Sequence, residues 1–164
     1  MKIMKARQEH SKDLGFINEL DEDIRTRFLK EGRFVERQQG DYLAVQGQPL
    51  EVMSVIISGS IRLTVNSHGN TVVVTSLGSG DVFGEMSVID PRQASATARV
   101  SGGPAHLWNI DYRSFNDFIA SDQLIGFSIM KAMARILCRK LRTDNENMLH
   151  QASDLCSHFL DQDY

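Results

Sequence analysis

The sequence predicts an α+β fold, in which a β-rich middle section lies between helical ends. Residues 16–32 carry four apolar side chains at a constant spacing of four residues, which is the pattern of one helical face. Residues 34–110 consist of short β-rich runs separated about every ten residues by turn signals, which indicates an all-β sandwich or barrel. Helical periodicity returns after Asp111. We therefore expect N-terminal helices, an antiparallel β structure and a long C-terminal helix.

The helical segments carry recognisable start and stop signals. Asp21 is an expected N-cap, and Gly32 is expected to end the first helical segment, which is a short helix or a helix pair. Asp111 is a second expected N-cap. A longer helix is expected to begin near Asp122 and to continue past residue 145.

Two kinds of strand are expected in the middle section. Residues 61–66 alternate apolar and polar side chains, which predicts a strand with one buried face, followed by a hairpin turn at Gly69. Val55–Ile57 and Val72–Val74 are continuous apolar triplets, which predicts two central strands. Gly59 and the SGGP segment at 101–104 are interpreted as turns between strands.

Composition narrows the class of protein. A chain of 164 residues with 41% hydrophobic residues is long enough to bury a core in one domain. The net charge of -3 argues against a protein that coats nucleic acid. No apolar run approaches the roughly 18 residues of a membrane span, and no signal peptide is recognisable, so we expect a cytoplasmic protein without a membrane partner. Cys138 and Cys156 would lie about 27 Å apart on one helix, so we expect free thiols.

The segment Phe83–Val100, FGEMSVIDPRQASATARV, resembles the phosphate-binding cassette of cyclic nucleotide-binding domains. This family includes the sensor domains of CRP/FNR-like regulators and kinase regulatory subunits. The stretches ISGSIRLTV at 57–65 and SLGSGDVFGEMSVID at 76–90 match the approach to the cassette. The resemblance implies an antiparallel β jelly roll, or double-stranded β-helix, of about eight strands. It places an N-terminal extension at 1–15, the domain with its flanking helices at 16–150, and a C-terminal helical tail at 151–164.

The resemblance also implies a binding site for cAMP, cGMP or a related small anion, with no cofactor and no metal. Gly84 would let the backbone approach the cyclic phosphate, the amides of the next three residues would cradle it, and Glu85 would accept from the ribose 2′-hydroxyl. Aligned without gaps from Glu85, the family's phosphate-binding arginine falls on Ala94. Arg92 is either a substitute for that arginine or a solvated loop residue. The expected ligand-binding residues are Phe83, Gly84, Glu85, Met86, Ser87, Arg92, Ala94, Ser95, Thr97, Asp144 and Asn145.

The long C-terminal helix carries three further features. The resemblance places Asp144 and Asn145 near the base of a bound nucleotide. A basic stripe is interpreted as a solvated face; its members are Lys131, Arg135, Arg139 and Arg142. A heptad seam either packs on the chain's own barrel or joins two helices in a homodimer; its members are Leu137, Leu141, Asp144, Met148, Gln151 and Leu155.

The sequence leaves three hypotheses about the function of the chain. The first is a non-catalytic sensor module that binds a nucleotide or another small anion and signals through the long helix to a dimer or a separate protein effector. The second is a degenerate cassette that serves as a dimerisation or protein-interaction module, which Ala94 favours. The third is a cupin-type metalloenzyme, but His68 and His106 lack the required spacing, so we expect no enzyme activity. The regulators of this family add a helix-turn-helix after the long helix, whereas this sequence ends at Tyr164, so direct DNA binding is not expected.

Overall fold

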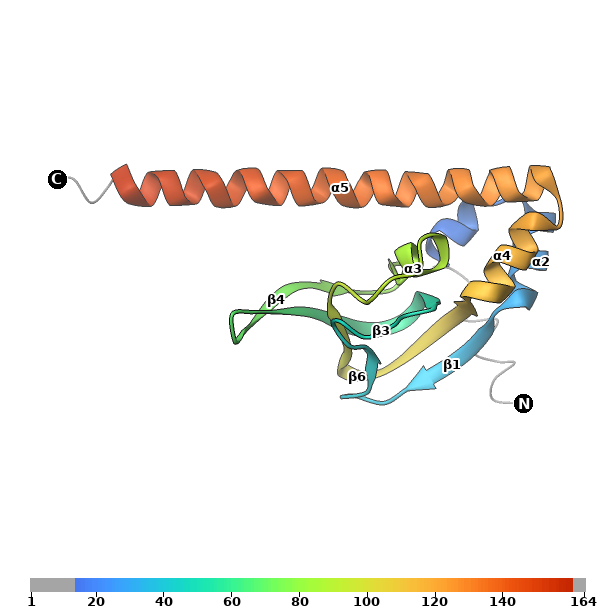
Figure 1. Cartoon of the computed structure of the whole chain (residues 1–164), viewed down its shortest axis with the longest axis horizontal. Helices are drawn as coiled ribbons and strands as arrows, with labels where there is room; N and C mark the ends of the chain where they lie inside the picture. The colour runs from blue at the N-terminus through green and yellow to red at the C-terminus, as the bar shows by residue number, and fades with distance from the viewer. Residues whose placement is uncertain (1–13, 161–164) are drawn as a thin grey trace.

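The computed structural model describes residues 14–160, with side chains described for residues 14–149, and it confirms the α+β class. Figure 1 shows a twisted antiparallel sheet with short helices at one end and one long helix, α5, passing over them. The elements in chain order are η1 (Gly15–Glu19), α2 (Glu22–Glu31), β1 (Arg33–Arg37), β2 (Tyr42–Ala44), β3 (Val52–Ser67), β4 (Asn70–Leu77), β5 (Val82–Phe83), α3 (Glu85–Ile89), β6 (Thr97–Asp111), α4 (Tyr112–Ala120) and α5 (Gln123–Leu160). Residues 1–13 of the predicted extension and the last four residues lie outside the described residues.

The N-terminal segment is a helix pair, as the sequence predicts. The 3₁₀-helix η1 ends where Leu20 adopts an extended backbone, and α2 begins after Asp21 at the N-cap and ends before Gly32. Phe16 and Phe28 are buried and contact each other edge to face, with ring centroids 6.2 Å apart. Trp108 of β6 also packs on Phe28, at 5.1 Å between centroids, so the helix pair is fixed to the sheet by aromatic contacts.

The sheet contains six described strands rather than about eight. Its order is β1-β6-β3-β4, β2 pairs with β6, β5 pairs with β3, and the pairings are antiparallel. The predicted turns at Gly59 and at 101–104 are bends inside the long strands β3 and β6. Gly59 has a φ of 95°, and a Cβ there would lie 2.7 Å from the Cα of Ala105. Glycine therefore lets the two strands cross closely while the pairing continues past the bend.

The β3–β4 hairpin turns at His68 and Gly69, as expected near Gly69. Both residues have positive φ angles, 52° and 83°, which is typical of a two-residue hairpin turn. The prediction that Val72–Val74 forms a central strand is wrong. β4 is an edge strand, and its three valines are 55–59% exposed, because an apolar triplet does not determine strand order. Val55–Ile57 is buried, as predicted.

Helix α5 divides into a packed part and an exposed part. Asp122 caps its start by accepting from the N–H groups of Leu124 and Ile125. The apolar face is buried as far as Ile136, and every side chain from Leu141 to Leu149 is exposed. The members of this buried face are Ile125, Ile129, Ala132, Met133 and Ile136.

The predicted heptad seam of α5 is half-buried at Leu137 and exposed at its later described positions. Leu141 and Met148 are 62% and 66% exposed, so they do not pack on the chain's own barrel. Cys138 is a free, exposed thiol, as predicted, while the side chain of Cys156 lies outside the described set. Within residues 14–160, none of the helices combines the length and the apolar character that crossing a membrane requires.

Candidate functional site

The predicted cassette begins at a tight turn between β5 and α3. Phe83 is buried and pairs with Ser54 of β3. Gly84 then adopts a left-handed backbone with φ of 73°, and a Cβ at this position would overlap the carbonyl oxygen of Val52. Only glycine fits here, because both the φ angle and the close approach exclude a side chain.

The first residues of α3 differ from the predicted three-amide cradle in one respect. The N–H groups of Glu85 and Met86 lie at the start of α3, where the helix itself provides no carbonyl acceptor for them. The N–H of Ser87, in contrast, donates to the carbonyl of Gly84 at 3.1 Å, so the turn itself uses this donor. The side chains alternate as well: Ser87 is buried, whereas Met86 is 60% exposed.

Glu85 is buried, and a lysine of α5 binds it. The Nζ atom of Lys140 lies 2.8 Å from Oε1 of Glu85 and donates to the carbonyl of Val82 at 2.7 Å. The Glu85 side chain is only 7% exposed, so its carboxylate needs a partner, and Lys140 supplies one. This cation therefore contacts both sides of the Phe83–Gly84 turn.

The second half of the cassette contains Ala94, the position at which the ungapped alignment expects the family's arginine. Ala94 is buried, its N–H donates to the carbonyl of Gln48, and its own carbonyl accepts from Gly47. Arg92 is exposed and forms an ion pair with Asp90, with 2.8 Å between Nε and Oδ2. This ion pair agrees with the interpretation of Arg92 as a solvated loop residue, because its guanidinium contacts the neighbouring carboxylate of Asp90.

The two predicted hydroxyl groups have different surroundings. Ser95 is exposed. Thr97 is half-buried, and its Oγ1 accepts from the N–H of Gln46 at 3.0 Å, so it holds the β2–β3 connection against β6.

The remaining predicted site residues lie on the exposed part of α5. Asp144 and Asn145 are exposed, and among the described residues no hydrogen bond or ion pair joins them to the cassette. Asp144 follows Lys140 by one helical turn and lies on the same side of α5.

The four residues of the basic stripe on α5 are exposed, as the sequence interpretation expects, and two of them also form surface ion pairs. Arg139 binds the Glu19 carboxylate of η1 at 2.8 Å, and Arg135 approaches the same carboxylate at 3.7 Å. Lys131 lies over the ring of Phe127, 5.7 Å from its centroid. The stripe thus contributes to holding α5 on the N-terminal helices.

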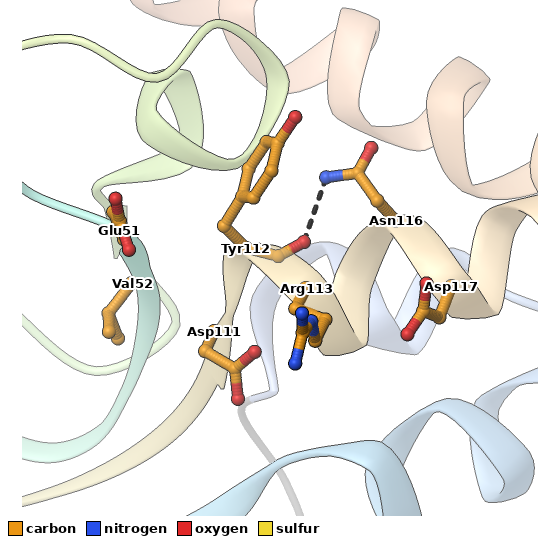
Figure 2. A pocket seen from close by; sticks show the side chains of 7 residues that line it. All are labelled: Glu51, Val52, Asp111, Tyr112, Arg113, Asn116 and Asp117. Atoms are coloured by element: carbon orange, nitrogen blue, oxygen red, sulfur yellow. Dashed lines mark hydrogen bonds between the residues drawn. The ribbon is translucent and has the colours of Figure 1, made fainter.

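A surface hollow of about 610 Å³ lies outside the cassette, at the start of α4. Figure 2 shows its lining side chains: Glu51, Val52, Asp111, Tyr112, Arg113, Asn116 and Asp117. Asn116 donates to the carbonyls of Tyr112 and Val88, so this surface is tied to the end of α3. Three carboxylates and one guanidinium line the hollow, which disfavours an anionic ligand there.

Asp111 in this hollow caps α4, as the sequence predicts. Its Oδ1 accepts from the Ser114 N–H at 2.9 Å, and its Oδ2 accepts from the Ser114 hydroxyl at 3.0 Å. The backbone N–H of Ser114 stabilises the ionised form and lowers the pKa of Asp111, and the Ser114 hydroxyl adds to this effect against the opposing effect of burial.

Sequence reasoning missed Lys140. A signal was present, because position 140 continues the apolar face of the helix at helical spacing. The preceding positions of that face are Ile125, Ile129, Met133 and Ile136. A lysine on the apolar face of a helix predicts a buried ion pair. The partner could not be read from the sequence, since Glu85 lies 55 residues away. Among residues 14–149, no group of three or more His, Cys, Asp or Glu side chains is arranged to hold a metal ion.

Comparison with known proteins identifies the family. A model described as "Cyclic nucleotide-binding domain" matches residues 34–122, more than half of the chain. The chain is 28% identical over 117 residues to the CRP-like cAMP-activated global transcriptional regulator of Mycobacterium tuberculosis. That match covers 70% of this chain and 49% of the regulator, so the chain spans about half the length of this relative.

Two solved structures show the same fold. A cyclic nucleotide-binding domain from Methylobacillus flagellatus superposes with a TM-score of 0.80 at 16% identity, covering 89% of this chain and 85% of the other. The catabolite activator protein of Thermus thermophilus gives a TM-score of 0.69 at 22% identity, covering 84% and 62%. The family match, the fold and the Gly84–Glu85 turn agree, and the chain belongs to the cyclic nucleotide-binding domain family.

Proposed function

We propose that this chain is a non-catalytic, cytoplasmic sensor module that binds cAMP, cGMP or a related anion in the 83–97 cassette and signals through α5. The observation that carries the proposal is the left-handed Gly84 followed by a buried Glu85 in a chain of this family. Such a turn brings backbone donors and one desolvated acceptor together, which suits a ligand that has both an anionic phosphate and a hydroxyl. The M. tuberculosis relative is described as cAMP-activated, which supports the same ligand class.

A second candidate is a cassette that no longer binds nucleotide and acts as a dimerisation or protein-interaction module. Ala94 favours it, because loss of a charge-assisted hydrogen bond to phosphate weakens binding by about one to two powers of ten. The pairing of Arg92 with Asp90 favours it as well, since this guanidinium is already engaged.

Both candidates include a homodimer formed through α5, with a separate protein effector as the alternative reader of the signal. Leu141 and Met148 stand seven residues apart on the exposed part of the helix, which is the spacing of a coiled-coil seam. The transcriptional activity of the relatives is not carried over to this chain.

Thermal shift and calorimetric titration with cAMP, cGMP and cyclic dinucleotides separate the two candidates. At a ligand concentration 100 times Kd, binding stabilises the fold by about 2.7 kcal/mol, which raises Tm by about 5–10 °C. Linear AMP and GMP serve as ligand controls. Glu85→Gln should weaken binding, whereas Glu51→Gln, an exposed carboxylate of the hollow, should leave it unchanged. Absence of any shift at millimolar ligand would favour the degenerate module.

A further inference from the structure

Lys140 joins α5 to the cassette by hydrogen bonds. Its ammonium binds the carbonyl of Val82 at 2.7 Å and the carboxylate of Glu85 at 2.8 Å, the residues that flank the Phe83–Gly84 turn. The contact joins residues 55 positions apart, and beyond it the described part of α5 is exposed. The last described contact of the packed part of α5 is therefore made by the Lys140 ammonium group, at the candidate site.

The cassette would disfavour an anion without this lysine. Glu85 is a buried carboxylate at the candidate site, and a buried negative charge repels phosphate strongly when water does not screen it. The family neutralises its site with an arginine, but Ala94 occupies that position here. Arg92 is exposed and pairs with Asp90. Among the side chains of residues 14–149, Lys140 is a cation that hydrogen-bonds to both residues flanking the Phe83–Gly84 turn.

We propose that Lys140 is the anion-recognising cation of this site and replaces the missing cassette arginine from α5. The inference rests on the proposed nucleotide function and specifies how the same site recognises its ligand. A lysine ammonium has three donors, and its described hydrogen bonds to Val82 and Glu85 use two of them. The third donor is left for a ligand oxygen, while the Glu85 carboxylate accepts from a ligand hydroxyl.

This arrangement couples ligand binding to the position of α5. The anion binds fully only when Lys140 is docked, so bound ligand must stabilise the docked helix by the same free energy. The coupling has a defined sign: ligand holds α5 on the cassette, and undocking of α5 releases ligand.

The decisive test uses Lys140→Met with Arg139→Met as its matched control. Arg139 is the neighbouring cation of α5 and forms an ion pair of the same length, 2.8 Å, with Glu19 of η1 instead of with the cassette. Calorimetry with cAMP should show a loss of about 10–100-fold in affinity for Lys140→Met and a change within about twofold for Arg139→Met. Lys140→Arg should retain most of the affinity because it keeps the charge.

Two further arms separate recognition of the anion from a structural role. Adenosine lacks the phosphate but keeps the ribose hydroxyl that Glu85 would bind, so Lys140→Met should weaken adenosine binding far less than cAMP binding. Ala94→Arg in the Lys140→Met background should restore cAMP binding by supplying the charge from the family position. Hydrogen exchange of residues 137–149 should slow on addition of cAMP in the native chain and not in Lys140→Met.

Each contrary result has a defined meaning. If the native chain binds none of cAMP, cGMP and the cyclic dinucleotides at millimolar concentration, the proposed function is wrong and this inference falls with it. If the native chain binds but Lys140→Met binds equally well, or more tightly, the inference alone is overturned, and tighter binding would make Lys140 a competitor for Glu85. An equal loss for adenosine and cAMP would overturn it in favour of a purely structural role.

Discussion

Gly84 packs directly against the backbone carbonyl of Val52, so the start of the cassette is fixed to the first residue of β3 without any side chain between them. The left-handed conformation of Gly84 and this close approach are two separate reasons for glycine at position 84. They can be separated experimentally, because Gly69 has a positive φ but no atom within 4 Å of its Cβ position.

Gly84→Ala should destabilise the fold by more than the roughly 1–3 kcal/mol expected from a left-handed backbone alone, because the added methyl group would overlap the Val52 carbonyl. Gly69→Ala is the matched control, since Gly69 has a φ of 83° and nothing within 4 Å of its Cβ position. Urea denaturation of both variants measures the difference. Equal losses would show that the contact with Val52 relaxes at no cost.

Ala94→Arg should strengthen cAMP binding by about 10–100-fold, because it restores a guanidinium at the family's phosphate position. Titration calorimetry checks this prediction. Ser67→Arg, at an exposed position of β3 outside the cassette, should leave the affinity unchanged. An unchanged affinity in a folded Ala94→Arg protein would mean that the ungapped alignment does not place residue 94 beside the phosphate.

Asp111→Ala should cost about 1 kcal/mol of unfolding free energy near neutral pH, because it removes the N-cap of α4. The pKa of Asp111 is lowered in the folded state, chiefly by the Ser114 N–H, so the stabilisation is present above the ordinary value of 3.8 and is lost as pH falls through the folded pKa. Denaturation of both proteins between neutral pH and about pH 3 should therefore show converging stabilities. Asp111→Asn keeps a capping oxygen without the charge and should depend less on pH than the native chain.

Leu141→Glu and Met148→Glu should dissociate a homodimer formed through α5, since each places a charge in the expected seam. Light scattering coupled to gel filtration measures the mass. Asn147→Glu adds the same charge beside the seam and should leave the dimer intact. A native chain that stays monomeric at high micromolar concentration would contradict the dimer.

The sequence was sufficient for local structure and insufficient for strand order. The helix starts after Asp21 and Asp111 and the turn at Gly69 could be predicted, because each depends on a few neighbouring residues, although only the Asp111 side chain of these two makes a capping hydrogen bond. The exposure of Val72–Val74 could not, since a strand is central or peripheral only through its partners. The bend at Gly59 was predicted as a turn because the same residue type serves both geometries.

The candidate site was predicted as a segment but not as a set of contacts. The Gly84 turn and the buried Glu85 follow from the local pattern of the cassette. The partner of Glu85 does not, because several cations lie on α5 and only tertiary packing determines which of them faces the cassette. Lys140 and Arg139 are adjacent in the chain, yet they bind carboxylates of different elements.

The length of α5 beyond Lys140 converts a small rotation of the helix into a large displacement of its C-terminal end. The helix axis runs for about 30 Å from Leu141, next to Lys140, to Leu160. A tilt of about 10° at Lys140 would therefore displace the far end by about 5 Å, although the atoms at the cassette would move far less. A displacement of about 5 Å is close to the rise of one helical turn. Formation or loss of the Lys140–Glu85 ion pair would therefore shift a partner bound at the far end of α5 by about one turn.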